Sequence, residues 1–113
     1  MNDDTTPIVT LKQWMAQFVA ERNWQVFHTP KNLAMSLAIE AAELMEHFQW
    51  LTTDESLAVR NQPDKRGEVA DELADVLCYA ISLANALDID IATAVREKMK
   101  KNAVKYPPPD TGA

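Results

Sequence analysis

The sequence predicts an all-α fold, a four-helix bundle assembled as a homo-oligomer. Apolar residues recur at spacings of three and four along most of the chain, which is the pattern of amphipathic helices. The 113 residues are 47% hydrophobic and include only two glycines, so we expect one helical domain spanning residues 1–113. Its core should lie at about residues 9–106, between flexible termini.

Local signals mark the first two helices. The first should run from Val9 to about Glu21, where apolar residues form one stripe. Thr29 and Pro30 supply an N-cap and a first-turn proline for the second, which we expect to reach about Trp50. The residues expected on its buried stripe are Leu33, Leu37, Ala41, Leu44 and Phe48.

A polar stretch, residues 52–67, separates these helices from two more and is expected to be a mobile loop that can contain a short helix. The third helix should run from about Arg66 to Leu87. The fourth should be capped by Asp88 or Asp90 and end near Lys101.

The later half of the third helix is apolar on almost every side. Such a helix must be covered all round, and three partner helices in one small chain do not suffice, so the pattern favours a homodimer or homotetramer. The tail after Tyr106 contains three consecutive prolines and should be irregular.

Composition excludes several classes of partner. The net charge of −6 leaves no excess of Lys and Arg for a nucleic acid polymer. The single cysteine, Cys78, excludes an intramolecular disulfide and suits a reducing cytoplasm. Residues 1–7 lack the pattern of a secretory signal, and the apolar run 73–87 is shorter than the roughly 20 residues that span a bilayer. We therefore expect a cytoplasmic protein that does not enter a membrane.

Two pairs of acidic residues carry the main functional signal. Glu40 and Glu43 are three residues apart in the second helix, and Glu72 and Asp75 are three apart in the third. Each pair therefore points to one side of an apolar helix, where unpaired negative charge is unfavourable. Carboxylate oxygens suit a hard divalent ion such as Mg²⁺, and that ion suits phosphate chemistry. The alternative is that both helices simply carry solvated acidic faces.

The acidic pairs belong to longer stripes at helical spacing. One stripe is Glu40, Glu43 and His47, and the other is Glu68, Glu72, Asp75 and Tyr79. A ferritin-like di-iron site would need Glu-x-x-His motifs, and neither histidine has a glutamate three residues before it. A P-loop is excluded because the chain has no glycine-rich phosphate loop.

Four segments, taken in order, resemble a known family. ERNWQVFHTPKNL, EAAELMEHFQW, ELADVLCYAISLANALDID and KMKKNAVKYP resemble the MazG-like nucleoside triphosphate pyrophosphohydrolases, in particular the dCTP pyrophosphatase branch. The resemblance covers about Leu11 to Pro107. It implies four main helices, a dimer or dimer of dimers, and active sites formed between helices and subunits. It also implies magnesium-dependent hydrolysis between the α and β phosphates, giving a nucleoside monophosphate and pyrophosphate.

The resemblance also assigns roles to residues of this chain. The implied catalytic and metal-binding acids are Glu40, Glu43, Glu72 and Asp75. The implied base and sugar contacts are Trp24, His28, Trp50 and Tyr79. The implied phosphate contacts are Lys98 and Asn102, and Lys31 and Tyr106 are additional candidates. Position 15 is Met where animal members of the branch carry a more polar residue, so the base preference stays open.

Several of these residues could instead have a purely structural role. Trp24 and Trp50 could be core anchors, Lys98 a solvated surface lysine, and His28 part of a helix cap. The expected function is hydrolysis of dCTP or a related deoxynucleoside triphosphate for cleansing of the nucleotide pool. The competing class is a noncatalytic helical module for interaction or regulation, which would bind no metal.

Overall fold

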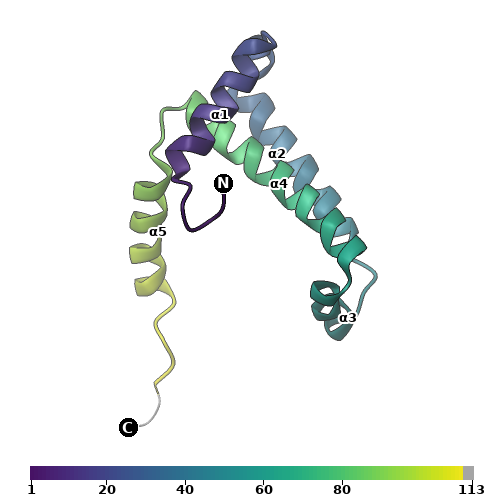
Figure 1. The fold of residues 1–113 in the computed structure, drawn as a ribbon. Coiled ribbons are helices and arrows are strands. Elements are labelled where there is room, and N and C mark those ends of the chain that lie inside the picture. The colour runs from purple at the N-terminus through teal and green to yellow at the C-terminus, as the bar shows by residue number, and fades with distance from the viewer. Residues whose placement is uncertain (111–113) are drawn as a thin grey trace.

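In the computed structural model of this protein, which describes residues 1–110, the chain is built from helices, and those residues contain no strand (Figure 1). The all-α prediction is confirmed. The elements are α1 (Ile8–Glu21), the short 3₁₀ helix η1 (Gln25–Phe27), α2 (Pro30–Glu46), α3 (Thr53–Ala58), the 3₁₀ helix η2 (Val59–Asn61), α4 (Pro63–Ala86) and α5 (Ile91–Lys105). The predicted tail beyond residue 110 lies outside the described residues.

The second helix is shorter than predicted. The prediction that it reaches Trp50 is wrong, because α2 ends at Glu46 and residues 47–50 form hydrogen-bonded turns. The amides of Phe48 and Gln49 both donate to the carbonyl of Met45 at 2.9 Å, so the helical ladder closes here without a glycine or proline to signal it. Its start is as expected, since the Thr29 hydroxyl accepts from the amide of Asn32.

The segment expected to be mostly loop is largely helical. Thr52 and Glu55 form a capping box that starts α3, with side chain to backbone bonds of 2.9 and 3.1 Å. α4 begins at Pro63 rather than Arg66, because proline is well suited to the first position of a helix. Gly67, at the predicted boundary between loop and helix, therefore lies inside α4.

The start of the last helix, α5, agrees with the prediction, but the helix is longer than predicted. Asp90 caps α5 by accepting from the amide of Thr93 at 3.0 Å. Asp88, in the turn before it, has a φ of 54°, a left-handed conformation that aspartate tolerates better than most residues. α5 continues one turn beyond the predicted end at Lys101, to Lys105.

Helices α2 and α4 form the centre of the molecule. They run antiparallel along their length, and α1 packs across the later part of α4 (Figure 1). Leu33 on α2, Val59 on η2 and Ala84 on α4 are the buried apolar residues of the described chain. Of the stripe predicted for α2, Leu33 is buried, Leu37, Leu44 and Phe48 are partly buried, and Ala41 is exposed.

Helix α5 extends away from the other helices instead of closing a bundle (Figure 1). The helices of one chain therefore do not close a bundle by themselves, and the four-helix bundle assembled as a homo-oligomer stays a prediction. The radius of gyration is 17.4 Å, against about 13 Å for a compact domain of roughly this length. Large apolar side chains stay exposed on α2, α4 and α5, including Ile39, Leu77 and Met99 at 59%, 52% and 59%.

Within residues 1–110 no single helix combines the length and hydropathy needed to cross a bilayer. α4 and α5 reach that length and hydropathy only when taken together, and the chain bends by 102° between them.

Candidate metal centre and adjoining pocket

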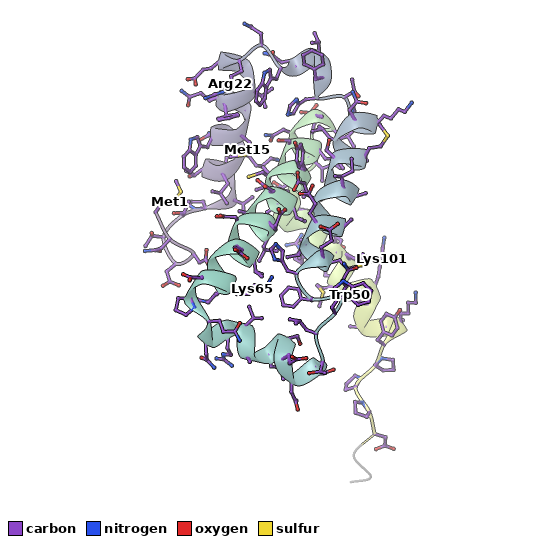
Figure 2. All side chains as sticks on the ribbon, turned by 90° about the vertical axis from the view of Figure 1, so that its right-hand side faces the viewer. Met1, Met15, Arg22, Trp50, Lys65 and Lys101 are labelled. Atoms are coloured by element: carbon purple, nitrogen blue, oxygen red, sulfur yellow. The ribbon has the colours of Figure 1, made fainter. Side chains whose placement is uncertain are left out.

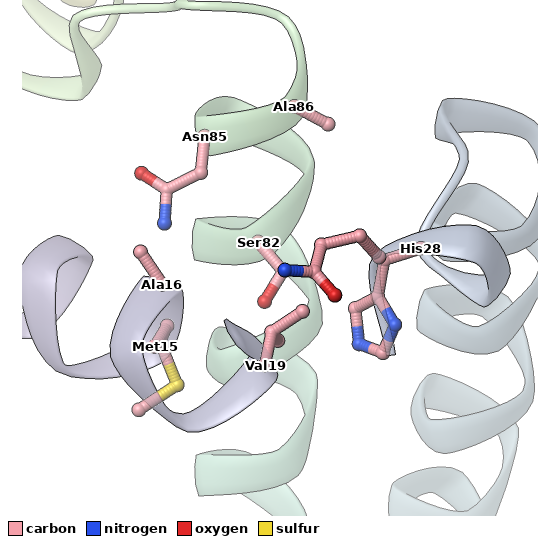
Figure 3. A pocket seen from close by; sticks show the side chains of 8 residues that line it. Met15, Ala16, Val19, His28, Ser82, Asn85 and Ala86 are labelled. Carbon is pink, nitrogen blue, oxygen red and sulfur yellow. The ribbon is translucent and has the colours of Figure 1, made fainter. Parts of the chain in front are cut away.

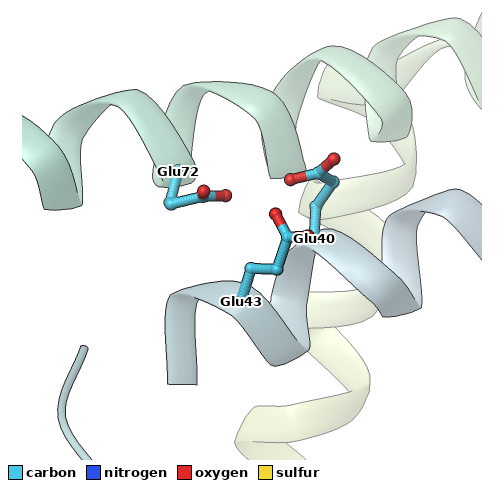
Figure 4. Close-up of side chains that lie close together, drawn as sticks. All are labelled: Glu40, Glu43 and Glu72. Atoms are coloured by element: carbon cyan, nitrogen blue, oxygen red, sulfur yellow. The ribbon is translucent and has the colours of Figure 1, made fainter. Parts of the chain in front are cut away.

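Three carboxylates from the two central helices converge on one point. Glu40 and Glu43 project from α2 toward Glu72 on α4, and one oxygen of each lies within 4.8 Å of the others (Figure 4). We call these three residues the acidic cluster. The two helices bring them together because the spacing of three places Glu40 and Glu43 on the α2 face that packs against α4.

The cluster holds more negative charge than its surroundings neutralise. Burial, the close carboxyls of Glu43 and Glu72, and the charge of Asp75 together raise the pKa of Glu40 to about 7. The Oε2 atoms of Glu40 and Glu72 are buried and accept no hydrogen bond from the described residues. A divalent cation would satisfy these oxygens and remove the repulsion, so the donor set fits a hard metal ion.

Asp75 lies beside the cluster rather than within it. Its charge acts on Glu40, but its oxygens are not among the three that converge. It lines instead a pocket of about 240 Å³ between α1 and α4, together with Met15, Trp24, His28 and Tyr79. We call this the α1–α4 pocket. The predicted metal acid and three of the predicted base contacts therefore meet at one place in a single chain.

A second hollow of about 260 Å³ continues the α1–α4 pocket toward the end of α4 (Figure 3). The two share Met15, Val19, His28 and Ser82 in their walls, and the second ends at Asn85. Its walls are largely apolar, as is usual for sites that hold a flat ring. Asn85 is held by the bond from its Nδ2 to the Lys12 carbonyl, at 2.9 Å.

Local contacts orient the aromatic side of the pocket. His28 Nδ1 lies 3.1 Å from the Trp24 carbonyl, and a carbonyl can only accept, so Nδ1 carries a proton. In the neutral ring Nε2 is then left as an acceptor, and the ring faces the hollow in Figure 3. The rings of Trp24 and His28 are nearly parallel, with centroids 6.1 Å apart, while Phe18 meets Trp24 edge-on at 5.6 Å. Trp24 is 41% exposed, so it is not the core anchor considered from sequence.

The other residues implied by the resemblance lie elsewhere in the chain. Trp50 follows the far end of α2 and is 87% exposed (Figure 2). Some 17 residues of helix, about 25 Å, separate it from Trp24 and His28. Lys98 and Asn102 lie on α5, which stands apart from α2 and α4.

The other two predicted phosphate contacts, Tyr106 and Lys31, also lie outside the α1–α4 pocket. Tyr106 follows α5 and is 67% exposed, with Lys105 Nζ 5.2 Å from its ring centroid. Lys31 is exposed in the first turn of α2, at the end where Trp24 and His28 lie. None of the five outlying side chains, Lys31, Trp50, Lys98, Asn102 and Tyr106, lines the α1–α4 pocket of its own chain.

Some lining residues were not predicted. Phe18, Cys78 and Ser82 line the α1–α4 pocket, and none was singled out as a contact. Ser82 continues the stripe of Asp75 and Tyr79 at helical spacing, so the sequence held a signal for it. Burial, with the charge of Asp75 beside it, raises the pKa of the Cys78 thiol and so disfavours the reactive thiolate.

The fold and the cluster together define a helical protein with a carboxylate site suited to a divalent metal. The sequence profile of the MazG-like family matches residues 35–112, and the chain belongs to that family. The predicted relationship is thereby confirmed.

Known pyrophosphatases are similar to most of the chain. The chain is 40% identical to dCTP pyrophosphatase 1 of Rattus norvegicus and to that of Homo sapiens, over 97 residues, which is 86% of its length. The chain spans 57% of the length of these relatives. The crystal structure of a pyrophosphatase from Archaeoglobus fulgidus superposes with a TM-score of 0.84 at 40% identity, covering 96% of this chain and 99% of that one.

Proposed function

We propose that this protein hydrolyses a deoxynucleoside triphosphate between its α and β phosphates, with Mg²⁺ as cofactor and a monophosphate and pyrophosphate as products. The preferred substrate would be dCTP or a close relative. The physiological role would be the removal of unwanted nucleotides in the cytoplasm. One observation carries the proposal. Buried carboxylate oxygens that accept no hydrogen bond within residues 1–110 lie close to Asp75, which lines the α1–α4 pocket. The names of the relatives support the same chemistry.

The acids would hold the metal and a water molecule. Glu40, Glu43 and Glu72 supply the converging oxygens, and Asp75 adds a fourth carboxylate toward the pocket. Mg²⁺ bound there would neutralise phosphate charge and make a coordinated water more acidic. Burial and the neighbouring carboxylates raise the pKa of Glu40 to about 7, and a bound cation would relieve that repulsion.

The pocket would hold the nucleoside end of the substrate. Trp24 offers an aromatic face, worth roughly 1–3 kcal/mol when a base stacks on such a ring. His28 Nε2 can accept a hydrogen bond from an amino or hydroxyl group, because Nδ1 already donates to the Trp24 carbonyl. Tyr79 lies one turn of α4 beyond Asp75, which suits a sugar placed between base and phosphate.

A homodimer or homotetramer would complete the site, and this too is a proposal. Exposed apolar residues on α2 and α4, such as Ile39 at 59% and Leu77 at 52%, need cover. Helix α5 carries one acid, Glu97, against the basic residues Arg96, Lys98, Lys100, Lys101 and Lys105, so it is complementary to an acidic face. A second copy could thus bring Lys98, Asn102 and Trp50 to the acidic cluster and pocket.

The first test incubates the purified protein with Mg²⁺ and the eight common nucleoside triphosphates, and separates the products by chromatography. We expect monophosphate and pyrophosphate, with a pyrimidine deoxynucleotide turned over fastest. Running the reaction in ¹⁸O-labelled water locates the attack, because label in the monophosphate means attack at the α phosphorus. Chelation by EDTA should abolish turnover, and added Mg²⁺ should restore it.

Two outcomes would contradict the proposal. Diphosphate and phosphate as products would reject cleavage between the α and β phosphates. No turnover of any substrate, with no stabilisation by Mg²⁺ on heating, would favour the noncatalytic helical module.

A further inference from the structure

A second polar pair lies between the same two helices, beyond the acidic cluster. Lys65 Nζ, in the first turns of α4, is 2.9 Å from Nδ1 of His47 at the end of α2. An ammonium group has no acceptor, so Nδ1 accepts and the proton of the neutral imidazole is on Nε2. The bond fixes one ammonium proton and leaves two to donate to another group.

This pair continues the stripes that form the acidic cluster. On α2, His47 follows Glu43 by four residues, and on α4, Lys65 precedes Glu72 by seven, so each lies on the same helix face as its acid. Because α2 and α4 are antiparallel, Glu40 and Glu43 meet Glu72, and one to two turns further on His47 meets Lys65. Lys65 thus lies about 10 Å from Glu72 along the axis of α4.

The position of Lys65 relative to the pocket suggests what it binds. The α1–α4 pocket is lined by Asp75, Tyr79 and Ser82, which all follow Glu72 along α4, whereas Lys65 precedes it. A nucleotide with its base in that pocket and its cleaved bond at the cluster directs its distal phosphates toward Lys65. From these positions we infer that Lys65, positioned by His47, binds the β and γ phosphates of the substrate and the pyrophosphate product, an inference that rests on the proposed function.

The surroundings of Lys65 suit this role. Its side chain is 33% exposed, so a ligand can reach the ammonium group. Among residues 1–110 its ion-pair partner is Glu68, which is 3.9 Å away and 63% exposed. Such an exposed pair is weak and leaves the lysine charge largely available to a ligand. A lysine offers a compact charge to a phosphate, and His47 limits the number of positions that this flexible side chain adopts.

The experiment measures binding of magnesium pyrophosphate and, separately, of dCMP by calorimetry on the full chain. Lys65→Met should weaken pyrophosphate binding roughly ten-fold, the loss expected for one charge-assisted hydrogen bond, and leave dCMP binding unchanged. Lys65→Arg should retain most of the affinity. Arg60→Met serves as the control, because Arg60 is an exposed cation on η2, outside the acidic cluster and the α1–α4 pocket, and should have no effect on either ligand.

Variants of His47 test its role as a positioning residue. His47→Gln keeps an acceptor for the ammonium group and should bind pyrophosphate more tightly than His47→Leu, which removes it. In turnover assays, both Lys65→Met and His47→Leu should raise KM for the triphosphate more than they lower kcat, if thermal unfolding shows intact folding.

The outcomes separate this inference from the proposed function. Turnover of dCTP by the native protein, together with equal pyrophosphate affinity in Lys65→Met and native protein, would overturn the inference alone. An equal loss of pyrophosphate and dCMP binding would also overturn it, since the pair would then only support the helices. Absence of turnover in the native protein would instead reject the proposed function.

Discussion

Two regions of the molecule carry the predicted functional residues, and they differ in how complete they are. Between α2 and α4, residues far apart in sequence meet within one chain, as with the acidic cluster and the Lys65–His47 pair. The predicted residues on α5 and Trp50 lie away from the pocket, with Lys98 and Trp50 exposed and Asn102 half-buried. The contrast teaches that the acidic cluster forms within one chain, whereas the predicted phosphate contacts on α5 lie apart from it and would reach it only in the proposed homo-oligomer.

The largest expected effect comes from removing a carboxylate charge in the region between α2 and α4. Glu43→Gln and Asp75→Asn should each lower kcat at least about 100-fold, because each would remove a proposed metal ligand with little change of volume. Circular dichroism and thermal unfolding should show that the helices remain. The matched control is Glu46→Gln, an exposed glutamate on α2 outside the cluster, which should keep near-native turnover. Full activity in both acid variants would reject their role as metal ligands.

The incomplete region can be tested by mixing variants. Lys98→Met should lower kcat/KM about ten-fold or more, as expected for loss of a charged phosphate contact. Mixing Lys98→Met with Glu43→Gln chains, after subunit exchange, should restore about a quarter of native activity in a dimer that shares its sites, because half of the dimers are mixed and each has one intact site. Failure to regain activity would mean that α5 does not serve the cluster of a partner.

A smaller effect is expected at Trp50. Trp50→Ala should raise KM about five- to ten-fold with little change in the Mg²⁺ requirement, provided that a partner copy brings the ring to the base. Trp24→Ala, which alters the pocket within the same chain, should raise KM by a similar factor. An unchanged KM and base preference in Trp50→Ala would remove this residue from the site.

The smallest effect concerns the stability of the metal-free protein. Because the pKa of Glu40 is raised from 4.5 to about 7, the folded protein keeps a proton that the unfolded chain loses as the pH rises between these values. The free energy of unfolding should therefore fall from pH 4.5 to 7 and then level off. Glu40→Gln should flatten this part of the profile, and Mg²⁺ should stabilise the native protein most at the upper end. A native profile that rises over this range would contradict the assigned pKa.

Much of the local structure was predictable because it depends on neighbouring residues. Thr29 with Pro30, and Asp90, marked helix starts that the structure confirms, since a cap bonds to amides within a few residues. The end of α2 was missed because its turns after Glu46 carry no glycine or proline, and the start of α4 because Pro63 was read as part of a loop.

The sequence by itself determined which residues share a helix face, and so it placed Glu40 with Glu43 and Glu72 with Asp75. Only the tertiary structure decided that Glu40, Glu43 and Glu72 converge while Asp75 turns toward the pocket, because the register between α2 and α4 depends on side-chain packing across the chain. The same holds for Lys65 and His47, whose contact spans 18 residues of sequence. The position of α5 is likewise tertiary: its helix is encoded locally, but its direction depends on the turn at Asp88 and on what covers its apolar side.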